Sequence, residues 1–281
     1  MTIGFIGQGF IGKNYADDFE ARGHMVVRYA LEEPYVQNVD AIRECDIVFI
    51  AVPTPTTPEG FSTEILEDAL THVGAGKIAV IKSTVLPGTT RRLQEKHSGL
   101  TILMSPEFLS EATAAYDAAH PFSNIVGLPV DDEVHQKAAE AVHALLPAAP
   151  YATMCTSDQA ELIKYAHNVS GYTQIVTFNM LYELSQSLGA DWAPIEQALD
   201  ADPMISRRYA HPLHKSGRGA GGHCFIKDFA ALRGLYEQVV NDPAGKAALV
   251  AFEKKNIELL RNTHKDLDLL RGVYGDDVPD A

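Results

Sequence analysis

A glycine-rich turn near the start of the chain constrains its fold more than any other feature. Residues 2–6 form a short apolar run of β-forming residues, three glycines follow it, and an amphipathic stretch covers 11–22. Glycines in this arrangement permit a tight strand-to-helix turn and let the backbone approach a pyrophosphate at the helix N-terminus. The sequence therefore predicts a dinucleotide-binding βαβ unit. Its expected cofactor contacts are Gly7, Gly9, Phe10, Ile11 and Gly12.

Short apolar runs alternate with helical patterns through the first half of the chain. Further strands are expected at 24–29, 46–52, 77–82, 100–104 and 124–128, and helices at 62–73 and 88–97. This alternation is typical of a doubly wound parallel sheet. We therefore expect a Rossmann-type α/β domain over residues 1–155.

From residue 157 the pattern becomes helical. Apolar residues recur at helical intervals through one long segment, 157–188, and Gly189 supplies a stop signal. A further helix is expected at 192–200, a loop rich in glycine, histidine and arginine at 203–222, and helices at 224–240 and 244–271. Residues 156–281 are therefore predicted to form an all-helical domain with a long central helix.

The composition narrows the class of protein. The chain has 281 residues, 46% of them hydrophobic, which suffices for about two folded domains. Its formal net charge of −14 disfavours a nucleic-acid-binding surface or a basic membrane-surface helix. The first residues are typical of a strand rather than a signal peptide, and no run of about 18 apolar residues predicts a membrane span. Three cysteines are typical of a reducing compartment, so a cytoplasmic protein is expected.

Three polar pairs share a spacing of four residues. They are Glu107 with Glu111, Lys164 with Asn168, and Cys224 with Asp228. On a helix this spacing places both members on one face. Glu161 extends the second pair into a polar line on the long predicted helix, and we favour a functional stripe over a solvated one.

Cys224 follows a Gly-Gly-His run and opens a predicted helix. Backbone N–H groups and the helix dipole favour a thiolate at such a position, and Lys227 would add to this effect. We therefore interpret Cys224 as a nucleophile, and Cys45 and Cys155 as inert small hydrophobes. The loop histidines have no common zinc spacing, so no metal site is expected.

The second predicted strand ends near Ala30, where dinucleotide-binding units have an acid for the adenosine ribose. Glu32 or Glu33 would have to substitute for that acid. Arg28 would suit a phosphorylated ribose. The residues thus favour NAD and leave NADP open.

Five motifs together resemble the UDP-glucose/GDP-mannose dehydrogenase family of nucleotide-sugar dehydrogenases. They are Val52–Pro55, Lys82–Thr90, Ser105–Glu111, Glu161–Asn168 and Gly221–Asp228, in the family's order. The resemblance implies that the chain oxidises the primary alcohol of a nucleotide sugar to a carboxylate with NAD. It also implies a homodimer and a place in polysaccharide biosynthesis.

The resemblance implies roles for individual residues. Cys224 would form a thiohemiacetal and then a thioester with the substrate. The other implied catalytic residues are Lys164 and Asn168 for the oxyanion, Asp228 and Thr84 for a water molecule, Glu111 for thioester hydrolysis, and Glu107 in support. Further implied cofactor contacts are Pro53, Thr54, Ser83, Thr84 and Lys227. The implied substrate contacts are Phe108, Leu109, Lys164, Arg207, Arg208, Tyr209 and Gly221.

Two departures from the family pattern concern the substrate. Family members usually continue into a third, Rossmann-type domain over the substrate nucleotide, so a short member without that domain is expected. Met204 stands where the family has an arginine, for which Arg207 or Arg208 would have to compensate. A basic phosphate pocket would draw on Lys82, Lys164, Arg207, Arg208, Lys215, Arg218 and Lys227.

Two other functions remain open. A two-electron dehydrogenase of the β-hydroxyacid type has the same two-domain plan, with a lysine and an asparagine four apart on its long helix. Simple alcohol oxidation, however, requires no thiol such as Cys224. The third possibility is a non-catalytic NAD-binding subunit that needs a partner chain.

Overall fold

The structure, a computed structural model, describes residues 1–215 and 217–276. The chain packs as two compact units. The first comprises residues 1–54 and 62–164, and the second comprises residues 55–61 and the chain from Tyr165 onward. The boundary expected after residue 155 lies just before the long helix, whereas the two units divide inside that helix, after Lys164.

Within the described residues, the first unit contains a seven-stranded sheet in the order β2-β1-β3-β6-β7-β8-β9. The strands are β1 (Thr2–Ile6), β2 (Met25–Tyr29), β3 (Ile47–Ile50), β6 (Ile78–Ile81), β7 (Thr101–Met104), β8 (Ser123–Leu128) and β9 (Tyr151–Thr156). Neighbouring strands pair in parallel except β7 and β8, which are antiparallel. The strand order reverses between β1 and β3, where open α/β sheets bind their ligands.

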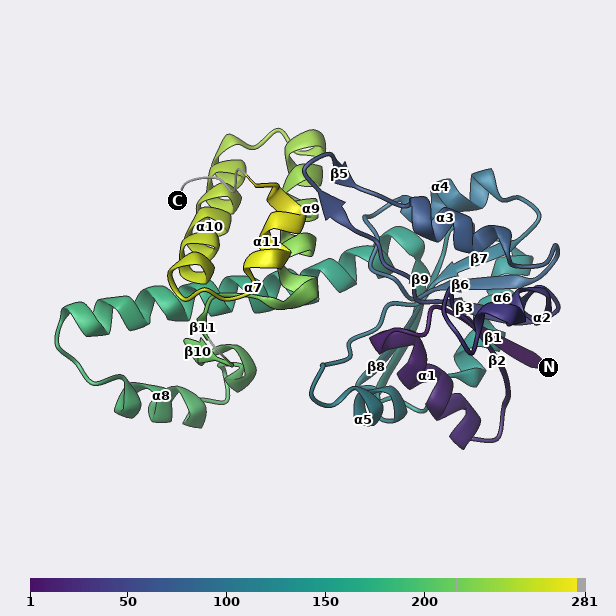
Figure 1. The fold of residues 1–281 in the computed structure, drawn as a ribbon, viewed down its shortest axis with the longest axis horizontal. Coiled ribbons are helices and arrows are strands. Elements are labelled where there is room, and N and C mark those ends of the chain that lie inside the picture. The colour runs from purple at the N-terminus through teal and green to yellow at the C-terminus, as the bar shows by residue number, and fades with distance from the viewer. Residues whose placement is uncertain (216, 277–281) are drawn as a thin grey trace. The chain divides into compact units, whose positions relative to one another are not determined.

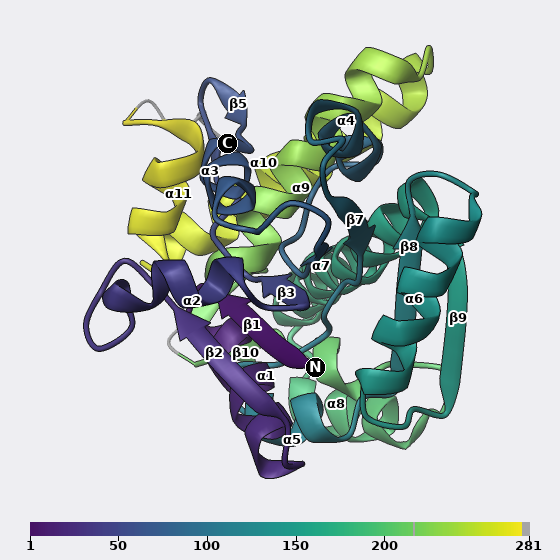
Figure 2. The same ribbon diagram turned by 90° about the vertical axis from the view of Figure 1, so that its right-hand side faces the viewer.

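Helices cover both faces of this sheet (Figure 1). Side chains of alternate strand residues, such as Ile3, Phe5 and Phe49, form a core with one set of helices. That set is α1 (Phe10–Ala21), α5 (Ala114–Ala119) and α6 (Glu133–Leu145), the last of which lies beside β8 in Figure 2. The opposite face carries the 3-10 helix Val36–Asn38, α2 (Val39–Arg43), α3 (Glu64–Thr71) and α4 (Thr89–Lys96). The prediction of a Rossmann-type α/β domain is confirmed.

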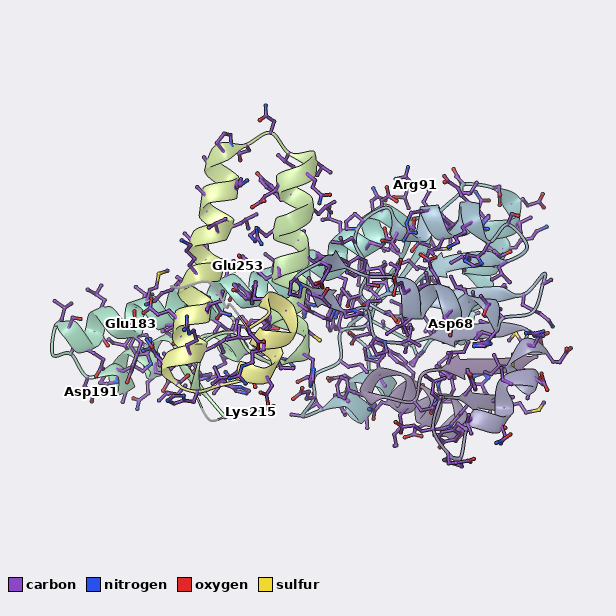
Figure 3. All side chains as sticks on the ribbon, turned by 45° about the horizontal axis from the view of Figure 1, so that its top comes forward. Asp68, Arg91, Glu183, Asp191, Lys215 and Glu253 are labelled. Atoms are coloured by element: carbon purple, nitrogen blue, oxygen red, sulfur yellow. The ribbon has the colours of Figure 1, made fainter. Side chains whose placement is uncertain are left out.

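The second unit is mainly helical. It contains the rest of α7 (Ser157–Ser187), together with α8 (Trp192–Ala201), η2 (Arg207–Tyr209), α9 (Gly222–Val239), α10 (Pro243–Asn262) and α11 (Leu267–Tyr274). Glu253 of α10, labelled in Figure 3, joins three of these helices. Its carboxylate lies 2.8 Å from Arg233 Nε of α9 and accepts a hydrogen bond of 2.9 Å from the Tyr274 hydroxyl of α11. In the part of the chain that the structure describes, no helix has the length and apolar character of a membrane span.

Three short β elements were not expected. They are β9, the hairpin of β4 (Thr56–Thr57) with β5 (Gly60–Phe61), and the hairpin of β10 (Leu213–His214) with β11 (Gly217–Arg218). The last of these lies in the predicted loop 203–222, so the second unit is not purely helical. β9 is an edge strand whose side chains are half-buried or exposed, and hydrogen bonds to β8 hold it. Hydrophobic alternation therefore gives no signal for it.

The prediction of one helix over 244–271 is wrong. The structure has two helices, α10 and α11, separated by residues 263–266. His264 and Asp266 in this break have positive φ angles of 54° and 53°. No glycine or proline marks the break in the sequence, so the helical pattern alone did not reveal it.

Candidate active site

The glycine turn between β1 and α1 fits an approaching ligand at one position. A Cβ on Gly7 would lie 2.3 Å from the Ala51 carbonyl oxygen, and one on Gly12 would lie 1.9 Å from the Gly7 carbonyl oxygen. The fold itself therefore requires both of these glycines. Gly9, the N-cap of α1, has a φ of −72°, and a Cβ there would meet no atom within 4 Å. The space at Gly9 fits a pyrophosphate bound at the helix N-terminus.

Arg28 is not placed to receive a ribose phosphate. Its side chain is buried, and Nη2 lies 2.7 Å from both Asp17 and Glu20. Because two carboxylates already neutralise the guanidinium, the NADP alternative loses its support, and NAD is favoured.

The loops after β3 and β6 are tied together by hydroxyl groups. Thr54 donates to the carbonyl of Thr84 at 2.7 Å, and Ser83 donates to the carbonyl of Val52 at 2.7 Å. These contacts fix the carboxyl ends of β3, which borders the switch point, and of its neighbour β6. That Pro53, Thr54, Ser83 and Thr84 line the cofactor stays a prediction.

Lys164 and Glu107 form a buried ion pair in the first unit. Lys164 Nζ lies 2.8 Å from the Glu107 carboxylate and donates to its backbone carbonyl at 2.7 Å. Burial alone would raise the pKa of Glu107, but the charge and hydrogen bond of Lys164 outweigh it, and the pKa is lowered. The ammonium group also lies 5.4 Å from the centre of the Phe108 ring. The fold thus fixes a cation next to two expected substrate contacts, Phe108 and Leu109.

The helical spacing assumed for Glu107 and Glu111 is wrong. Residues 105–110 are irregular, and α5 begins only at Ala114. Glu107 is buried, whereas Glu111 is exposed. The two side chains therefore do not share a helix face, and the role of Glu111 stays a prediction.

Glu161 has a structural task that the sequence did not reveal. It is fully buried on α7, and it accepts hydrogen bonds from the Gly88 N–H at 2.7 Å, the Thr90 N–H at 2.7 Å and the Thr90 hydroxyl at 2.6 Å. Burial raises the pKa of Glu161 to about 7. Glu161 thus caps the N-terminus of α4. The polar line of Glu161, Lys164 and Asn168 is therefore a set of buried residues, each of which binds a different part of the chain.

Cys224 and Asp228 lie one turn apart on α9, as their spacing predicts. Cys224 is the third residue of the helix and is exposed. Asp228 is buried; it accepts a hydrogen bond of 2.7 Å from Asn168 Nδ2, and its other oxygen lies 2.6 Å from Lys227 Nζ. The second unit therefore presents an exposed thiol at a helix N-terminus, followed by a carboxylate fixed on both oxygens.

The expected substrate residues around the 3-10 helix η2 differ in their surroundings. Tyr209 packs edge-on against the Phe225 ring, with ring centres 5.9 Å apart, next to Cys224 in the chain. Arg207 and Arg208 are exposed, and Arg207 lies 3.9 Å from Asp200. Met204 is 90% exposed.

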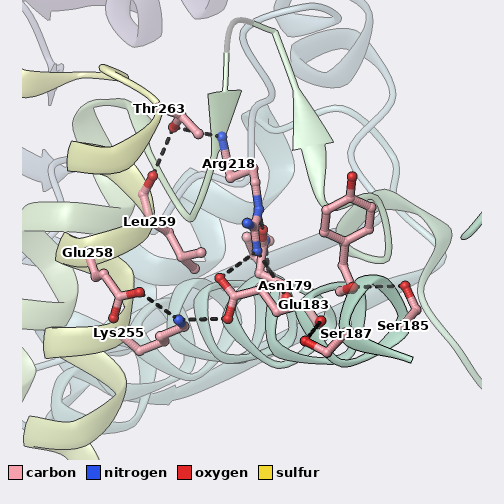
Figure 4. Close-up of polar contacts among 11 residues, drawn as sticks. Asn179, Glu183, Ser185, Ser187, Arg218, Lys255, Glu258, Leu259 and Thr263 are labelled. Carbon is pink, nitrogen blue, oxygen red and sulfur yellow. Dashed lines mark hydrogen bonds and ion pairs between the residues drawn. The ribbon is translucent and has the colours of Figure 1, made fainter. Parts of the chain in front are cut away.

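Arg218 does not belong to a phosphate pocket. Its guanidinium donates to Asn179 Oδ1 at 2.8 Å and to Glu183 at 3.0 Å, both on α7 (Figure 4). Lys82 is also buried. The prediction that Arg218 contributes to a basic phosphate pocket is therefore wrong, because Asn179 and Glu183 of α7 already bind its guanidinium.

Four residues that bind the loop before Cys224 were not predicted from the sequence. They are Asn256, Thr263, Lys265 and Asp266. Their only mark in the sequence is that polar residues occur where the helical pattern was expected to continue.

Solved structures share this fold. The UDP-glucose dehydrogenase from Pyrobaculum islandicum matches with a TM-score of 0.75 and 27% identity, over 90% of this chain and 67% of that chain. A UDP-D-ManNAc dehydrogenase from Pyrococcus horikoshii has a TM-score of 0.76 and 19% identity, over 93% and 69% of the two chains. The 3-hydroxyisobutyrate dehydrogenase of Mycobacterium tuberculosis has a TM-score of 0.69 and 18% identity, over 95% and 96%. The last two likenesses are evidence of fold alone.

Curated relatives are longer than this chain. The putative UDP-glucose 6-dehydrogenase YtcA of Bacillus subtilis is 30% identical over 205 residues, 69% of this chain and 46% of that protein. The UDP-glucose 6-dehydrogenase AglM of Haloferax volcanii is 29% identical over 282 residues, 83% of this chain and 64% of that protein. The chain thus spans about half to two thirds of the length of these relatives.

Two sequence models of one family match most of the chain. The NAD binding domain of the UDP-glucose/GDP-mannose dehydrogenase family matches residues 35–146, and the central domain of that family matches residues 158–251. The first match, together with the space at Gly9, identifies NAD as the cofactor. The chain therefore belongs to the UDP-glucose/GDP-mannose dehydrogenase family.

Proposed function

We propose that this protein is an NAD-dependent dehydrogenase that oxidises the primary alcohol of a nucleotide sugar to a carboxylate through a thioester on Cys224. The observation that carries the proposal is the exposed Cys224 at the start of α9, one turn before the fixed carboxylate of Asp228. Alcohol oxidation to a carbonyl requires no nucleophile, whereas oxidation to a carboxylate gains from one. The relatives named as UDP-glucose 6-dehydrogenases support the nucleotide-sugar class.

In this mechanism the chain holds the substrate carbon while it is oxidised. NAD, when bound at the glycine turn, supplies the hydride acceptor for each of the two oxidations. After the alcohol has become an aldehyde, Cys224 Sγ adds to the carbonyl carbon and gives a thiohemiacetal. Oxidation of the thiohemiacetal gives a thioester, and one water cleaves the thioester to the carboxylate and the free thiol. Each substrate molecule therefore yields two NADH.

Fixed polar groups would assist these steps. The Asp228 carboxylate, held by Asn168 and Lys227, would orient water or accept a proton. The Lys164 ammonium, held by Glu107, and the Asn168 amide would stabilise the developing oxyanion. Thr84 is proposed to hold the water with Asp228, and Glu111 is proposed to assist thioester hydrolysis.

We also propose that two copies pair through the second half of α7. Met180 and Leu184 of α7 and Leu188, one residue beyond its end, follow one another at intervals of four residues and are 41%, 54% and 73% exposed. Leu181 beside them is 44% exposed, so the helix presents an apolar stripe. A second copy would cover this stripe, in a cytoplasmic enzyme of polysaccharide biosynthesis.

A two-electron dehydrogenase is the second candidate function. The 3-hydroxyisobutyrate dehydrogenase fold matches 96% of that chain and 95% of this one, so the fold is shared by both candidates. Cys224 and Asp228 favour the four-electron reaction.

The decisive experiment counts NADH. Purified protein is supplied with NAD and a limiting amount of UDP-glucose, GDP-mannose or another nucleotide sugar, and the absorbance of NADH is followed to completion. We expect about two NADH per sugar and loss of the carboxylate product in Cys224→Ala. Cys155→Ser, which changes a half-buried cysteine on β9, is the control and should retain the full yield.

Other outcomes identify the alternatives. One NADH per substrate, unchanged in Cys224→Ala, would establish a two-electron dehydrogenase. NAD binding without turnover of any nucleotide sugar would instead favour a non-catalytic subunit that needs a partner chain.

A further inference from the structure

The loop that enters α9 is rich in glycine and depends on other segments for its path. Residues 217–222 include four glycines. Glycine loses more conformational freedom on folding than any other residue, so such a loop keeps one path only where surrounding groups bind it. The path matters because Cys224 is the third residue of the helix that follows.

Side chains from one segment, residues 256–266, bind this loop residue by residue. Asn256 brackets Ala220, accepting from its N–H at 2.6 Å and donating to its carbonyl at 3.0 Å. The other contacts are the Arg218 N–H to Thr263 Oγ1 at 3.0 Å, Lys265 Nζ to the Gly219 carbonyl at 2.9 Å, and the Gly222 N–H to Asp266 Oδ2 at 2.7 Å. On the other side, the Arg218 side chain joins the loop to α7 (Figure 4).

The segment that supplies these groups has unfavourable features of its own. His264 and Asp266 have left-handed backbones, with φ angles of 54° and 53°. Lys265 is only 5% exposed, and burial lowers its pKa. Features of this kind persist where the surrounding structure enforces them, and they cluster at functional sites.

The close approach of Asp266 to the loop also explains why residue 221 is a glycine. A Cβ on Gly221 would lie 2.0 Å from Asp266 Oδ2. Gly221 was expected as a substrate contact, and the approach of this carboxylate is a separate reason why no side chain fits there.

We infer that Lys265 and Asp266 are positioning residues that fix the first turn of α9 and with it the direction of the Cys224 thiol. Asp266 acts on Gly222, the first residue of the helix, and Lys265 acts on Gly219, three residues earlier. The inference rests on the proposed role of Cys224 as nucleophile, but the exposure of the thiol can be measured without any substrate.

The test compares two substitutions that both suit a positive φ. Asp266→Gly removes the carboxylate, whereas Asp266→Asn keeps an acceptor oxygen for the Gly222 N–H. Both are made in a Cys155→Ser background, where Cys45 is buried and alkylation by iodoacetamide reports on Cys224. For Asp266→Gly we expect the alkylation rate to change about threefold or more, and kcat to fall about tenfold or more with the KM for NAD nearly unchanged. Hydrogen exchange at the Gly222 amide should also accelerate, and Asp266→Asn should restore all of these values.

Asp268→Ala is the matched control. Asp268 is the second residue of α11, two residues after Asp266, but its side chain is 96% exposed. It should leave the alkylation rate and the exchange unchanged. Wild-type alkylation and exchange in Asp266→Gly would overturn the inference.

Lys265→Met provides a second route if Asp266→Gly does not fold. It removes the donor to the Gly219 carbonyl, so the same changes are expected, and Lys265→Gln, which keeps a donor, should reverse them. Should neither Asp266→Gly nor Lys265→Met give folded protein, the segment is required for folding itself and the positioning inference is wrong. If alkylation responds as expected while the wild type turns over no nucleotide sugar, the proposed function fails and the positioning inference stands.

Discussion

Gly9 differs from its neighbours in the glycine turn because the folded chain does not itself require it. Its φ of −72° suits any residue, and a Cβ would meet no atom within 4 Å. We expect Gly9→Ala to retain or slightly raise stability, by up to about 1 kcal/mol, because alanine restricts the unfolded chain. A methyl group there would occupy the space of the pyrophosphate, so NAD affinity should fall about tenfold or more.

Gly12→Ala is the contrasting variant. Its Cβ would lie 1.9 Å from the Gly7 carbonyl oxygen, so we expect a loss of about 1–3 kcal/mol in the free energy of unfolding. Urea unfolding and NAD titration by calorimetry measure both quantities. Wild-type NAD affinity in Gly9→Ala would show that no ligand approaches this turn.

Lys82 makes stability depend on pH. It is buried after β6, and its ammonium group donates to Ser105 Oγ at 3.2 Å and lies 4.3 Å from the centre of the Tyr15 ring. Burial lowers its pKa from 10.5 to about 7. Between these two values the unfolded chain binds more protons than the folded one, so the contribution of Lys82 to stability rises with pH, by up to about 1.4 kcal/mol per unit.

Lys82→Met should remove this slope. We expect the free energy of unfolding of the variant to exceed that of the wild type by most near pH 6, where the buried ammonium is charged. The excess should shrink progressively toward pH 9. Urea unfolding at about pH 6, 7.5 and 9 measures the difference. Lys77→Met, at a half-exposed lysine just before β6, should keep the wild-type slope. An equal difference between Lys82→Met and the wild type at all three pH values would contradict the prediction.

At the scale of elements, Glu161 connects α7 to the N-terminus of α4. Its carboxylate receives three hydrogen bonds from Gly88 and Thr90. Glu161→Ala leaves all of these donors without their acceptor and should lower the free energy of unfolding by about 1–3 kcal/mol. Glu161→Gln keeps one acceptor oxygen and should lie between Glu161→Ala and the wild type.

Asp158→Ala is the control for this connection. Asp158 also joins α7 to α4, through an exposed ion pair of 2.8 Å with Arg91. Exposed pairs contribute little, so a change below about 1 kcal/mol is expected. If the two alanine variants lose equal stability in urea unfolding, the capping contacts of Glu161 contribute no more to stability than an exposed ion pair.

The elements also show what the sequence could predict. The buried strand β1 is a short run of β-forming residues, and α7 is a long stretch with apolar residues at helical intervals; both occur where they were expected. The edge strand β9 and the break between α10 and α11 depend on pairing with β8 and on contacts with a distant loop. No local pattern encodes such contacts.

In the candidate site, too, local sequence patterns predicted some features, whereas others depend on contacts between distant residues. Spacing alone placed Cys224 with Asp228 on α9, and Lys164 with Asn168 on α7. The partner of Lys164 is Glu107, 57 residues away in the chain, and only the fold brings the two together. Assigning Glu107 and Glu111 to one helix failed because an irregular segment has no side-chain period.

At the scale of the whole molecule, the apolar stripe on α7 predicts self-association. Sedimentation equilibrium of the wild type should give twice the chain mass of 30.6 kDa. Leu184→Glu places a charge in the middle of the stripe, where its burial against a second copy would be costly, so this variant should sediment as a monomer. Leu31→Glu, at a 79% exposed leucine outside any helix, is the control and should remain dimeric. A dimeric Leu184→Glu would show that another surface pairs the two copies, since an interface built on this stripe has no room for an uncompensated carboxylate.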